Sequence, residues 1–209
     1  MKWEGLYGII DPAQVWTGST PEEVTAAVLR GGAEVIQLRD KVSVDRDLLS
    51  LARKLKEICG RFGVPLIVNN RVDIALAAGA DGVHLGPEDL PVEIARRLAG
   101  SDFLIGGSAG SVEVARRLAR EGADYLGVGA IFEARPSKAD ASAPRGTRVL
   151  KEIGRAVDLP LFGIGGIDEE NAREVIEAGA CGIAVIRALN QAENPEEAAR
   201  RLCCAISSS

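Results

Sequence analysis

A three-residue pattern, glycine followed by alanine and one further residue, recurs at four places along this chain. It stands at Gly32-Ala33-Glu34, Gly79-Ala80-Asp81, Gly122-Ala123-Asp124 and Gly179-Ala180-Cys181. Each copy follows a segment with helical composition and precedes a short apolar segment. Glycine directly after a helix supplies the left-handed conformation that a turn into a strand needs. The repetition therefore favours a fold built from repeated helix-to-strand units.

Predicted strands and helices alternate along the whole chain. Most of the strands are short and apolar without polar alternation, which is typical of parallel strands buried on both faces. The expected strands are 6–10, 35–38, 66–68, 82–85, 104–105, 125–128, one beginning at 161, and 182–185; the expected helices are 21–30, 45–62, 72–78, 91–98, 112–121, one beginning near 147, one capped by Asp168, and one beginning at 195.

Eight strands alternating with eight helices predict an α/β protein, a single (βα)8 TIM barrel that forms one domain over residues 1–209. The length of 209 residues fits, because such barrels use about 200 to 250 residues as one domain. A doubly wound open sheet is the alternative. That fold is expected to carry a glycine-rich fingerprint after its first strand, and Ile10-Asp11-Pro12-Ala13 is not one.

The composition argues against several classes of partner. A net charge of -5 and an aromatic content of 4% do not suit a nucleic-acid binder, which needs a basic surface and stacking platforms. No apolar run approaches the roughly 20 residues of a membrane span, and the first residues do not resemble a secretory signal. The four cysteines show no zinc or disulfide spacing. We therefore expect a cytoplasmic protein, a monomer or small homo-oligomer, that binds small molecules.

Cations are expected at the carboxyl end of the second strand. Alternation along this strand puts Gln37, Arg39 and Lys41 on one face, with Gln37 in the barrel mouth and the two cations above it. A solvated charge run is the alternative interpretation. Because the active site of a barrel lies at the carboxyl ends of its strands, we favour a role in binding.

Hard oxygen ligands are expected at the ends of the third and fourth strands. The third strand ends in Asn69 and Asn70, and the fourth leads into Glu88 and Asp89. Parallel strands bring their carboxyl ends to one edge, so these side chains are expected to converge. The two acids could instead belong to the first turn of the next helix, where the helix dipole favours them. His84, the only histidine, is interpreted as a satisfied interior residue.

Phosphate is expected at the ends of the seventh and eighth strands. Gly165 and Gly166, beside a helix beginning near Asp168, predict a nest of backbone N–H groups for an anion. Arg187 either binds phosphate or faces solvent. The irregular segment from Gly129 to Arg145 carries Lys138 and is interpreted as an active-site lid or a disordered segment. Cations, oxygen ligands and a glycine turn suit a phosphorylated substrate and a Mg²⁺-bound pyrophosphate.

Six stretches together resemble the thiamine phosphate synthase family. They are QLRDK from Gln37, NNRVDIALAAGADGVHLGPEDLP from Asn69, GGSAGSVEVA from Gly106, GADYLGVGAIF with SKAD, FGIGGI and GIAVI, in the family's order and across nearly the whole chain. The resemblance implies a (βα)8 transferase that joins hydroxymethylpyrimidine diphosphate to thiazole phosphate and releases pyrophosphate, with Mg²⁺ as cofactor.

The resemblance also implies roles for individual residues. The pyrophosphate is held by Arg39, Lys41, Ser108 and Lys138, the magnesium by Asp89 with Asn70 beside it, and the thiazole phosphate by Gly165 and Gly166. We expect Gln37, Asn69, Ile186 and Arg187 to complete the set that contacts substrate.

This chain departs from the family pattern at several positions. Asn70 stands where the family has Asp, Gly110 where it has His, and Ala134 or Arg135 where its loop has Thr. Related thiazole tautomerases carry a catalytic His just after the sixth strand, at Ala130 here, and its absence favours the synthase. Two alternatives stay open: a tautomerase-like isomerase using His84 as base, and a non-catalytic paralogue that binds thiamine precursors.

Overall fold

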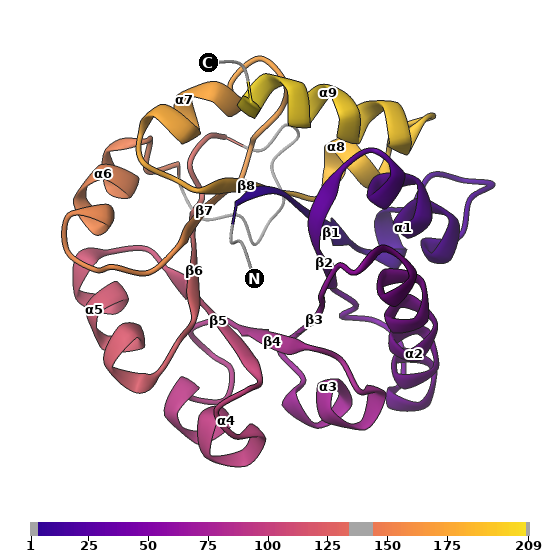
Figure 1. The fold of residues 1–209 in the computed structure, drawn as a ribbon, viewed down its shortest axis with the longest axis horizontal. Helices are drawn as coiled ribbons and strands as arrows, with labels where there is room; N and C mark the ends of the chain where they lie inside the picture. Colours follow the sequence, from indigo (N-terminus) through magenta and orange to yellow (C-terminus); the bar gives the residue numbers. More distant parts are fainter. Residues whose placement is uncertain (1–3, 134–143, 208–209) are drawn as a thin grey trace.

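The chain folds into a closed barrel of parallel strands in sequence order, surrounded by helices (Figure 1). The computed structural model describes residues 4–133 and 144–207. The strands are β1 Gly5–Ile10, β2 Ala33–Leu38, β3 Leu66–Asn69, β4 Gly82–Leu85, β5 Leu104–Ala109, β6 Tyr125–Gly129, β7 Leu161–Ile164 and β8 Gly182–Val185. The pairing of β1 with β8 closes the barrel. The predicted (βα)8 fold is therefore confirmed, and an open sheet is excluded.

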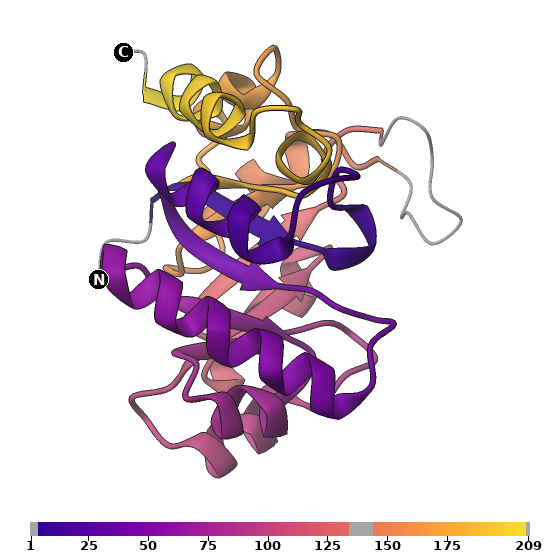
Figure 2. The same ribbon diagram turned by 90° about the vertical axis from the view of Figure 1, so that its right-hand side faces the viewer.

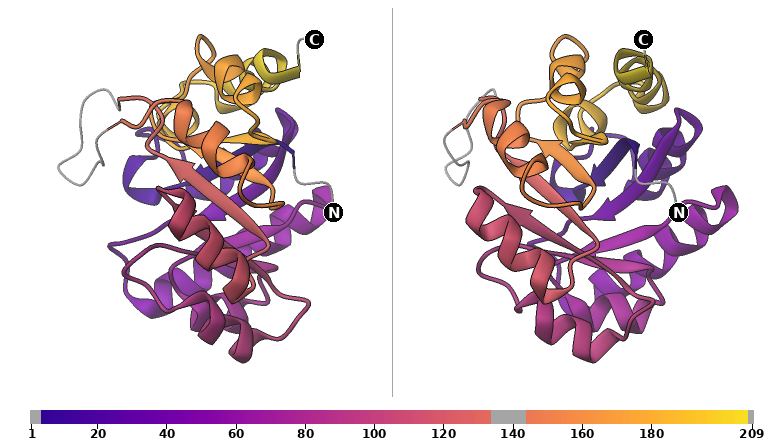
Figure 3. Two further views of the ribbon diagram at one scale, coloured as in Figure 1. Left: turned by 90° about the vertical axis from the view of Figure 1, so that its left-hand side faces the viewer. Right: turned by 60° about the vertical axis from the view of Figure 1, so that its left-hand side comes forward.

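Helices form a ring outside the strands, seen from the side of α1 and α2 in Figure 2 and from the side of α5 and α6 in Figure 3. They are α1 Pro21–Arg30, α2 Asp45–Phe62, α3 Val72–Ala78, α4 Val92–Ala99, α5 Val112–Glu121, α6 Arg148–Gly154, α7 Ala172–Glu177, α8 Arg187–Asn190 and α9 Pro195–Ser207, with a 3-10 turn at Pro12–Gln14. Within the described residues, no helix combines the length and the apolar character that crossing a membrane requires.

Local signals set most helix ends. Thr20 and Glu23 form the predicted capping box before α1, with Pro21 at the first helical position. The glycines of all four repeated turns, at positions 32, 79, 122 and 179, have positive φ. Because glycine alone adopts this conformation without steric cost, the repeated pattern fixes where the chain leaves a helix and enters the next strand.

The core has two parts, one between the strands and the helices and one inside the barrel. The inner part consists of Tyr7, Ile9, Val35, Ile67, Tyr125, Phe162 and Ala184. Inward-facing residues must fill a barrel of this size. Glycines make room for the large rings: a β-carbon at Gly106 would stand 2.1 Å from Cζ of Tyr125, and one at Gly182 would stand 2.6 Å from Cε1 of Phe162.

Two predictions of where an element begins or ends are wrong, and one helix was not predicted. The fifth strand runs to Ala109 instead of ending at Ile105, because its glycines and Ser108 pair with the neighbouring strands. Helix α7 begins at Ala172, and Asp168 instead accepts bonds from the N–H groups of Glu170 and Asn171 in the preceding turn. The short helix α8 directly after β8 was not predicted. It places Arg187 at a helix start.

We predict that Gly106→Ala lowers the free energy of unfolding by about 3 kcal/mol or more, because the added methyl group overlaps the ring of Tyr125 in a filled interior. Chemical denaturation measures the change. Gly60→Ala is the control, because Gly60 lies in α2 with open space around its α-carbon; there we expect a gain of about 0.5 to 1 kcal/mol. Equal stability of Gly106→Ala and the parent protein would contradict this packing.

Candidate active site

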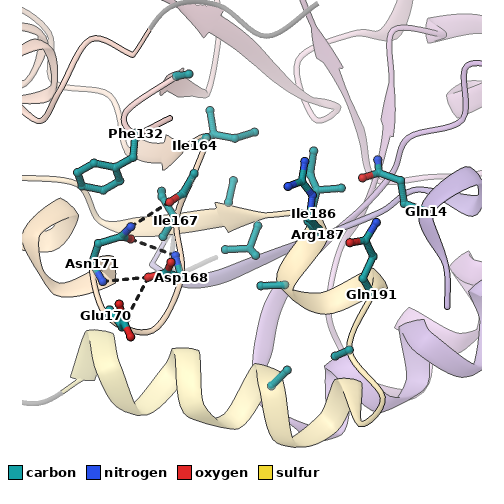
Figure 4. Close-up of a pocket in the computed structure, with 18 of the residues that line it drawn as sticks. Gln14, Phe132, Ile164, Ile167, Asp168, Glu170, Asn171, Ile186, Arg187 and Gln191 are labelled. Atoms are coloured by element: carbon teal, nitrogen blue, oxygen red, sulfur yellow. Dashed lines mark hydrogen bonds between the residues drawn. The ribbon is translucent and has the colours of Figure 1, made fainter. Parts of the chain in front are cut away.

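A cavity of about 1020 Å³ opens at the carboxyl ends of β7 and β8 (Figure 4). Five of the predicted site residues line it: Arg39, Gly165, Gly166, Ile186 and Arg187. Gln14, Phe132 and Asn171 contribute further wall. The cavity is thus lined by a cation that follows β2, by the glycine turn after β7 and by the start of α8. Barrels of this type commonly bind phosphate at strands seven and eight.

The turn after β7 is held in shape by Asn171. Its Nδ2 donates to the carbonyl of Gly166 at 2.9 Å, and its Oδ1 accepts from the backbone N–H of Asp168 at 3.0 Å (Figure 4). Gly165 and Gly166 have φ of 100° and 66°. A β-carbon at Gly166 would stand 2.7 Å from backbone atoms of Phe132 and Glu133. Only glycine therefore allows this turn to approach the segment after β6 so closely.

Arg39 is held by a buried carboxylate that the sequence did not single out. Its Nη1 donates to Oδ2 of Asp11 at 2.6 Å, and Asp11 is only 3% exposed. Gln14 donates to the same oxygen. Asn190, fully buried, accepts from the N–H of Asp11 at 3.0 Å and donates to the carbonyls of Ile9 and Ile186. The position of Arg39 thus depends on a network that joins the end of β1 to α8.

Polar side chains inside the barrel link two further predicted residues. Nε2 of Gln37 donates to the hydroxyl of Tyr7 at 2.8 Å, and the hydroxyls of Tyr7 and Tyr125 are 2.8 Å apart. The Tyr125 hydroxyl lies 3.3 Å from Nδ1 of His84, whose Nε2 lies 3.0 Å from Oγ of Ser108. His84 is therefore a satisfied interior residue, as the sequence predicted. Gln37 and Ser108 belong to one connected network.

Burial controls the protonation of this network. It lowers the pKa of His84 to about 4, although the residue keeps partial exposure, so the imidazole is neutral at pH 7. Burial also raises the pKa of Tyr7 and of Tyr125 above the ordinary range, so both hydroxyls keep their protons. A neutral His84 ring carries no positive charge with which to bind an anion. Both of its ring nitrogens already take part in hydrogen bonds, with Tyr125 and Ser108.

The predicted metal ligands occupy the ends of β3 and β4. Asn70 has a φ of 67°, in the left-handed region that Asn and Asp tolerate, and its Oδ1 accepts from the side chain of Asn69. Asp89 is partly buried, and its Oδ2 accepts from the N–H of Gly86 at 2.6 Å. Glu88 is exposed. In the described part of the chain, no three His, Cys, Asp or Glu side chains gather as a complete metal site.

Lys41 does not line the cavity. Lys41 is exposed in the loop after β2, which Asp40 shapes by accepting from the N–H groups of Val42 and Ser43. Lys138 lies outside the described residues. Arg145, which the sequence left without a role, donates to the carbonyl of Gly110 at 3.0 Å.

The guanidinium of Arg145 lies beside Gly110. A β-carbon there would stand 3.1 Å from Cζ of Arg145. The guanidinium thus lies beside the end of β5, close to the space that a side chain at this position would use. The departure from the family pattern at Gly110 is accompanied by a cation that reaches the same place from the segment before α6.

Comparison with known proteins identifies the family. The family described as thiamine monophosphate synthase matches residues 6–189. This chain belongs to that family. A thiamine-phosphate synthase of Roseiflexus castenholzii is 50% identical over 181 residues, which are 87% of this chain and 79% of the relative. A thiamine-phosphate synthase of Natronomonas pharaonis is 42% identical over 203 residues, which are 97% of this chain and 94% of the relative.

Solved structures agree with this assignment. The thiamine phosphate pyrophosphorylase of Pyrococcus furiosus is 36% identical, with a TM-score of 0.88, over 98% of this chain and 96% of that one. A 3-hexulose-6-phosphate synthase, with a TM-score of 0.71 and 19% identity over 97% of this chain and 100% of that one, shares the fold alone. Relatives named as synthases support the predicted synthase, an enzyme of the transferase class, over a tautomerase-like isomerase or a non-catalytic paralogue.

We predict that Gly166→Ala weakens the binding of inorganic phosphate by about 10-fold, or about 1.4 kcal/mol, because the methyl group displaces the turn from the backbone of Phe132. Isothermal titration calorimetry measures the affinity. Gly179→Ala is the control, since Gly179 also has positive φ but open space around it. Both changes are expected to lower stability by about 1 to 2 kcal/mol. Equal phosphate affinity in the two variants would show that the glycine turn is not a phosphate site.

Proposed function

We propose that this chain joins hydroxymethylpyrimidine diphosphate to thiazole phosphate, giving thiamine phosphate and pyrophosphate. One observation carries the proposal: Arg39 and the glycine turn of β7 face the same cavity. A reaction between two phosphorylated molecules needs two anion sites that open into one space. Membership of the synthase family supports this choice of substrates.

The proposed reaction is a dissociative transfer. The bond between the pyrimidine methylene carbon and the diphosphate oxygen breaks, and pyrophosphate leaves with the electron pair. The lone pair of the thiazole nitrogen then forms a bond to the methylene carbon. No protein nucleophile is needed, and the protein's task is to stabilise the departing charge and to hold the thiazole in place.

The proposed site divides by strand. Residues of the β2, β3 and β5 ends and the loop after β6 bind the pyrimidine diphosphate: Gln37, Arg39, Lys41, Asn69, Ser108 and Lys138. Residues of the β7 and β8 ends bind the thiazole phosphate: Gly165, Gly166, Ile186 and Arg187. Arg39 and the whole second group line one cavity, which supports two anion sites that open into the same space.

Magnesium is proposed as cofactor, held by Asp89 and Asn70. Asp89 offers a carboxylate and Asn70 an amide oxygen, both hard donors. Mg²⁺ is usually bound through one or two carboxylates together with substrate phosphates and waters, so this sparse donor set fits an ion that is shared with the diphosphate. A Mg²⁺ ion held by Asp89 and Asn70 would supply positive charge to offset the charge that develops on the departing pyrophosphate.

We also propose that the protein acts in the cytoplasm on small phosphorylated molecules. The described residues contain no disulfide, and the net charge of -5 disfavours nucleic acid. The decisive experiment incubates the purified protein with both phosphorylated precursors and Mg²⁺. Thiamine phosphate with equimolar pyrophosphate supports the synthase; an isomerised thiazole or binding without turnover would contradict it.

Lys138 tests the proposed clamp on the diphosphate. We expect Lys138→Ala to lower kcat by about 10²- to 10³-fold, which is the usual cost of losing one contact to the transition-state charge, with little change in melting temperature. Lys151→Ala, an exposed lysine in α6, is the matched control. Equal losses of turnover and of stability in Lys138→Ala would show that the residue is structural.

Asn70 tests the proposed metal site. Asn70→Asp adds a carboxylate and keeps the backbone, since Asp also tolerates left-handed φ. We expect a lower Mg²⁺ requirement for activity and a larger rise in melting temperature on adding Mg²⁺, because two carboxylates repel until the metal binds. Asn194→Asp, at the start of α9, is the control. If Asp89→Ala abolishes metal dependence while Asn70→Asp changes nothing, Asn70 lies outside the coordination sphere.

A further inference from the structure

A continuous chain of hydrogen bonds runs across the barrel interior through five strands. It begins at Gln37 on β2, passes through Tyr7 on β1, Tyr125 on β6 and His84 on β4, and ends at Ser108 on β5, with successive separations of 2.8, 2.8, 3.3 and 3.0 Å. Both ends of the chain are proposed substrate contacts. Its three inner members have no assigned role in the reaction.

Each inner member of this hydrogen-bonded series has a fixed number of protons to donate. A tyrosine hydroxyl carries one proton, and an imidazole whose one ring nitrogen accepts a hydrogen bond carries its single N–H on the other nitrogen. A hydroxyl that accepts from one neighbour in the chain therefore donates to the next. The direction of every bond follows once the direction of the first is known.

The first bond sets the direction, because Nε2 of Gln37 can only donate. Tyr7 accepts from Gln37 and donates to Tyr125. Tyr125 then donates to Nδ1 of His84, so the ring proton of His84 is on Nε2 and is donated to Oγ of Ser108. The proton of Ser108 is thereby directed away from His84.

We propose that His84 is a positioning residue whose Nε2–H tautomer, set by the bond from Gln37 through the two tyrosines, makes the Ser108 hydroxyl a hydrogen-bond donor to the diphosphate. This inference rests on the proposed function. Phosphate oxygens only accept hydrogen bonds. If every hydrogen bond of this series pointed in the opposite direction, Ser108 would donate to His84. Its oxygen would then present lone pairs to the anion, which is a repulsive arrangement.

The tautomer is directly measurable, because His84 is the only histidine in the chain. In protein labelled with ¹⁵N-histidine, the two ring nitrogens give the only histidine side-chain signals. At pH 7 we expect the protonated nitrogen to be Nε2 and the unprotonated nitrogen to be Nδ1. A ring protonated on Nδ1 would overturn the proposal whatever the enzyme's activity, so this readout separates the failure of the inference from the failure of the proposed function.

Removing one link tests the origin of the tautomer. Tyr125→Phe keeps the ring but removes the proton that Nδ1 of His84 accepts, so a signal from the Nδ1–H tautomer should grow. Phe162→Leu is the packing control: Phe162 contacts the rings of Tyr7 and Tyr125 at centroid distances of 5.2 and 5.9 Å but contributes no atom to the chain. It should lower stability and leave the tautomer unchanged. An unchanged tautomer in Tyr125→Phe would show that the chain does not set it.

Two substitutions of His84 itself test the consequence for Ser108. His84→Gln supplies an amide N–H in place of Nε2–H, whereas His84→Met supplies no donor. For inorganic pyrophosphate titrated in the presence of Mg²⁺, we expect a Kd within about 3-fold of the parent value in His84→Gln and about 10-fold weaker in His84→Met, as for one hydrogen bond to a charged group. Equal affinities in the two variants, both folded as judged by circular dichroism, would overturn the positioning role.

Discussion

A closed barrel of eight parallel strands encloses a space that its own inward-facing side chains must fill. In this chain the rings of Tyr7, Tyr125 and Phe162 contact one another across that space, with centroids 5.2 to 5.9 Å apart. Two of these rings end in hydroxyls, and a buried hydroxyl is costly unless it is hydrogen-bonded. The packing that fills the barrel therefore also produces the polar network that reaches Gln37 and Ser108. The side chains that pack the barrel interior are therefore the same ones that connect Gln37 and Ser108 of the candidate site.

Local sequence signals predicted most of the fold because the chain specifies its helix ends locally. The capping box at Thr20 and the positive-φ glycines act within a few residues, so they can be recognised without the structure. The fifth strand was predicted too short because its glycines have low strand propensity, and pairing with β4 and β6 overrides that propensity. Asp168 was assigned to the wrong feature because an aspartate at a turn and an aspartate at a helix cap carry the same sequence signal.

Part of the candidate site could be predicted because the topology of a barrel fixes which strand ends lie together. Barrel topology alone brings Arg39, the β7 glycines and Arg187 to one mouth, and the structure places all of them around one cavity. The partners of these residues could not be predicted, because they are distant in sequence: Asp11 stands 28 residues from Arg39. The relation between Arg145 and Gly110 is of the same kind. No periodicity or motif encodes such pairs, and only the closed barrel brings them together.

The hydrogen bonds of Asn190 have a consequence for the order in which the protein folds during its synthesis. The N–H of Asp11, whose carboxylate holds Arg39, finds its partner in Asn190, 179 residues later. At a synthesis rate of about 5 to 20 residues per second, the N-terminal strands wait on the order of ten seconds or more for that residue to be made. A nascent chain that already contains QLRDK and NNRVDIALAAGADGVHLGPEDLP thus lacks the hydrogen bonds that Asn190 gives to the network around Arg39. The network around Arg39 is complete only when the segment after β1 meets α8.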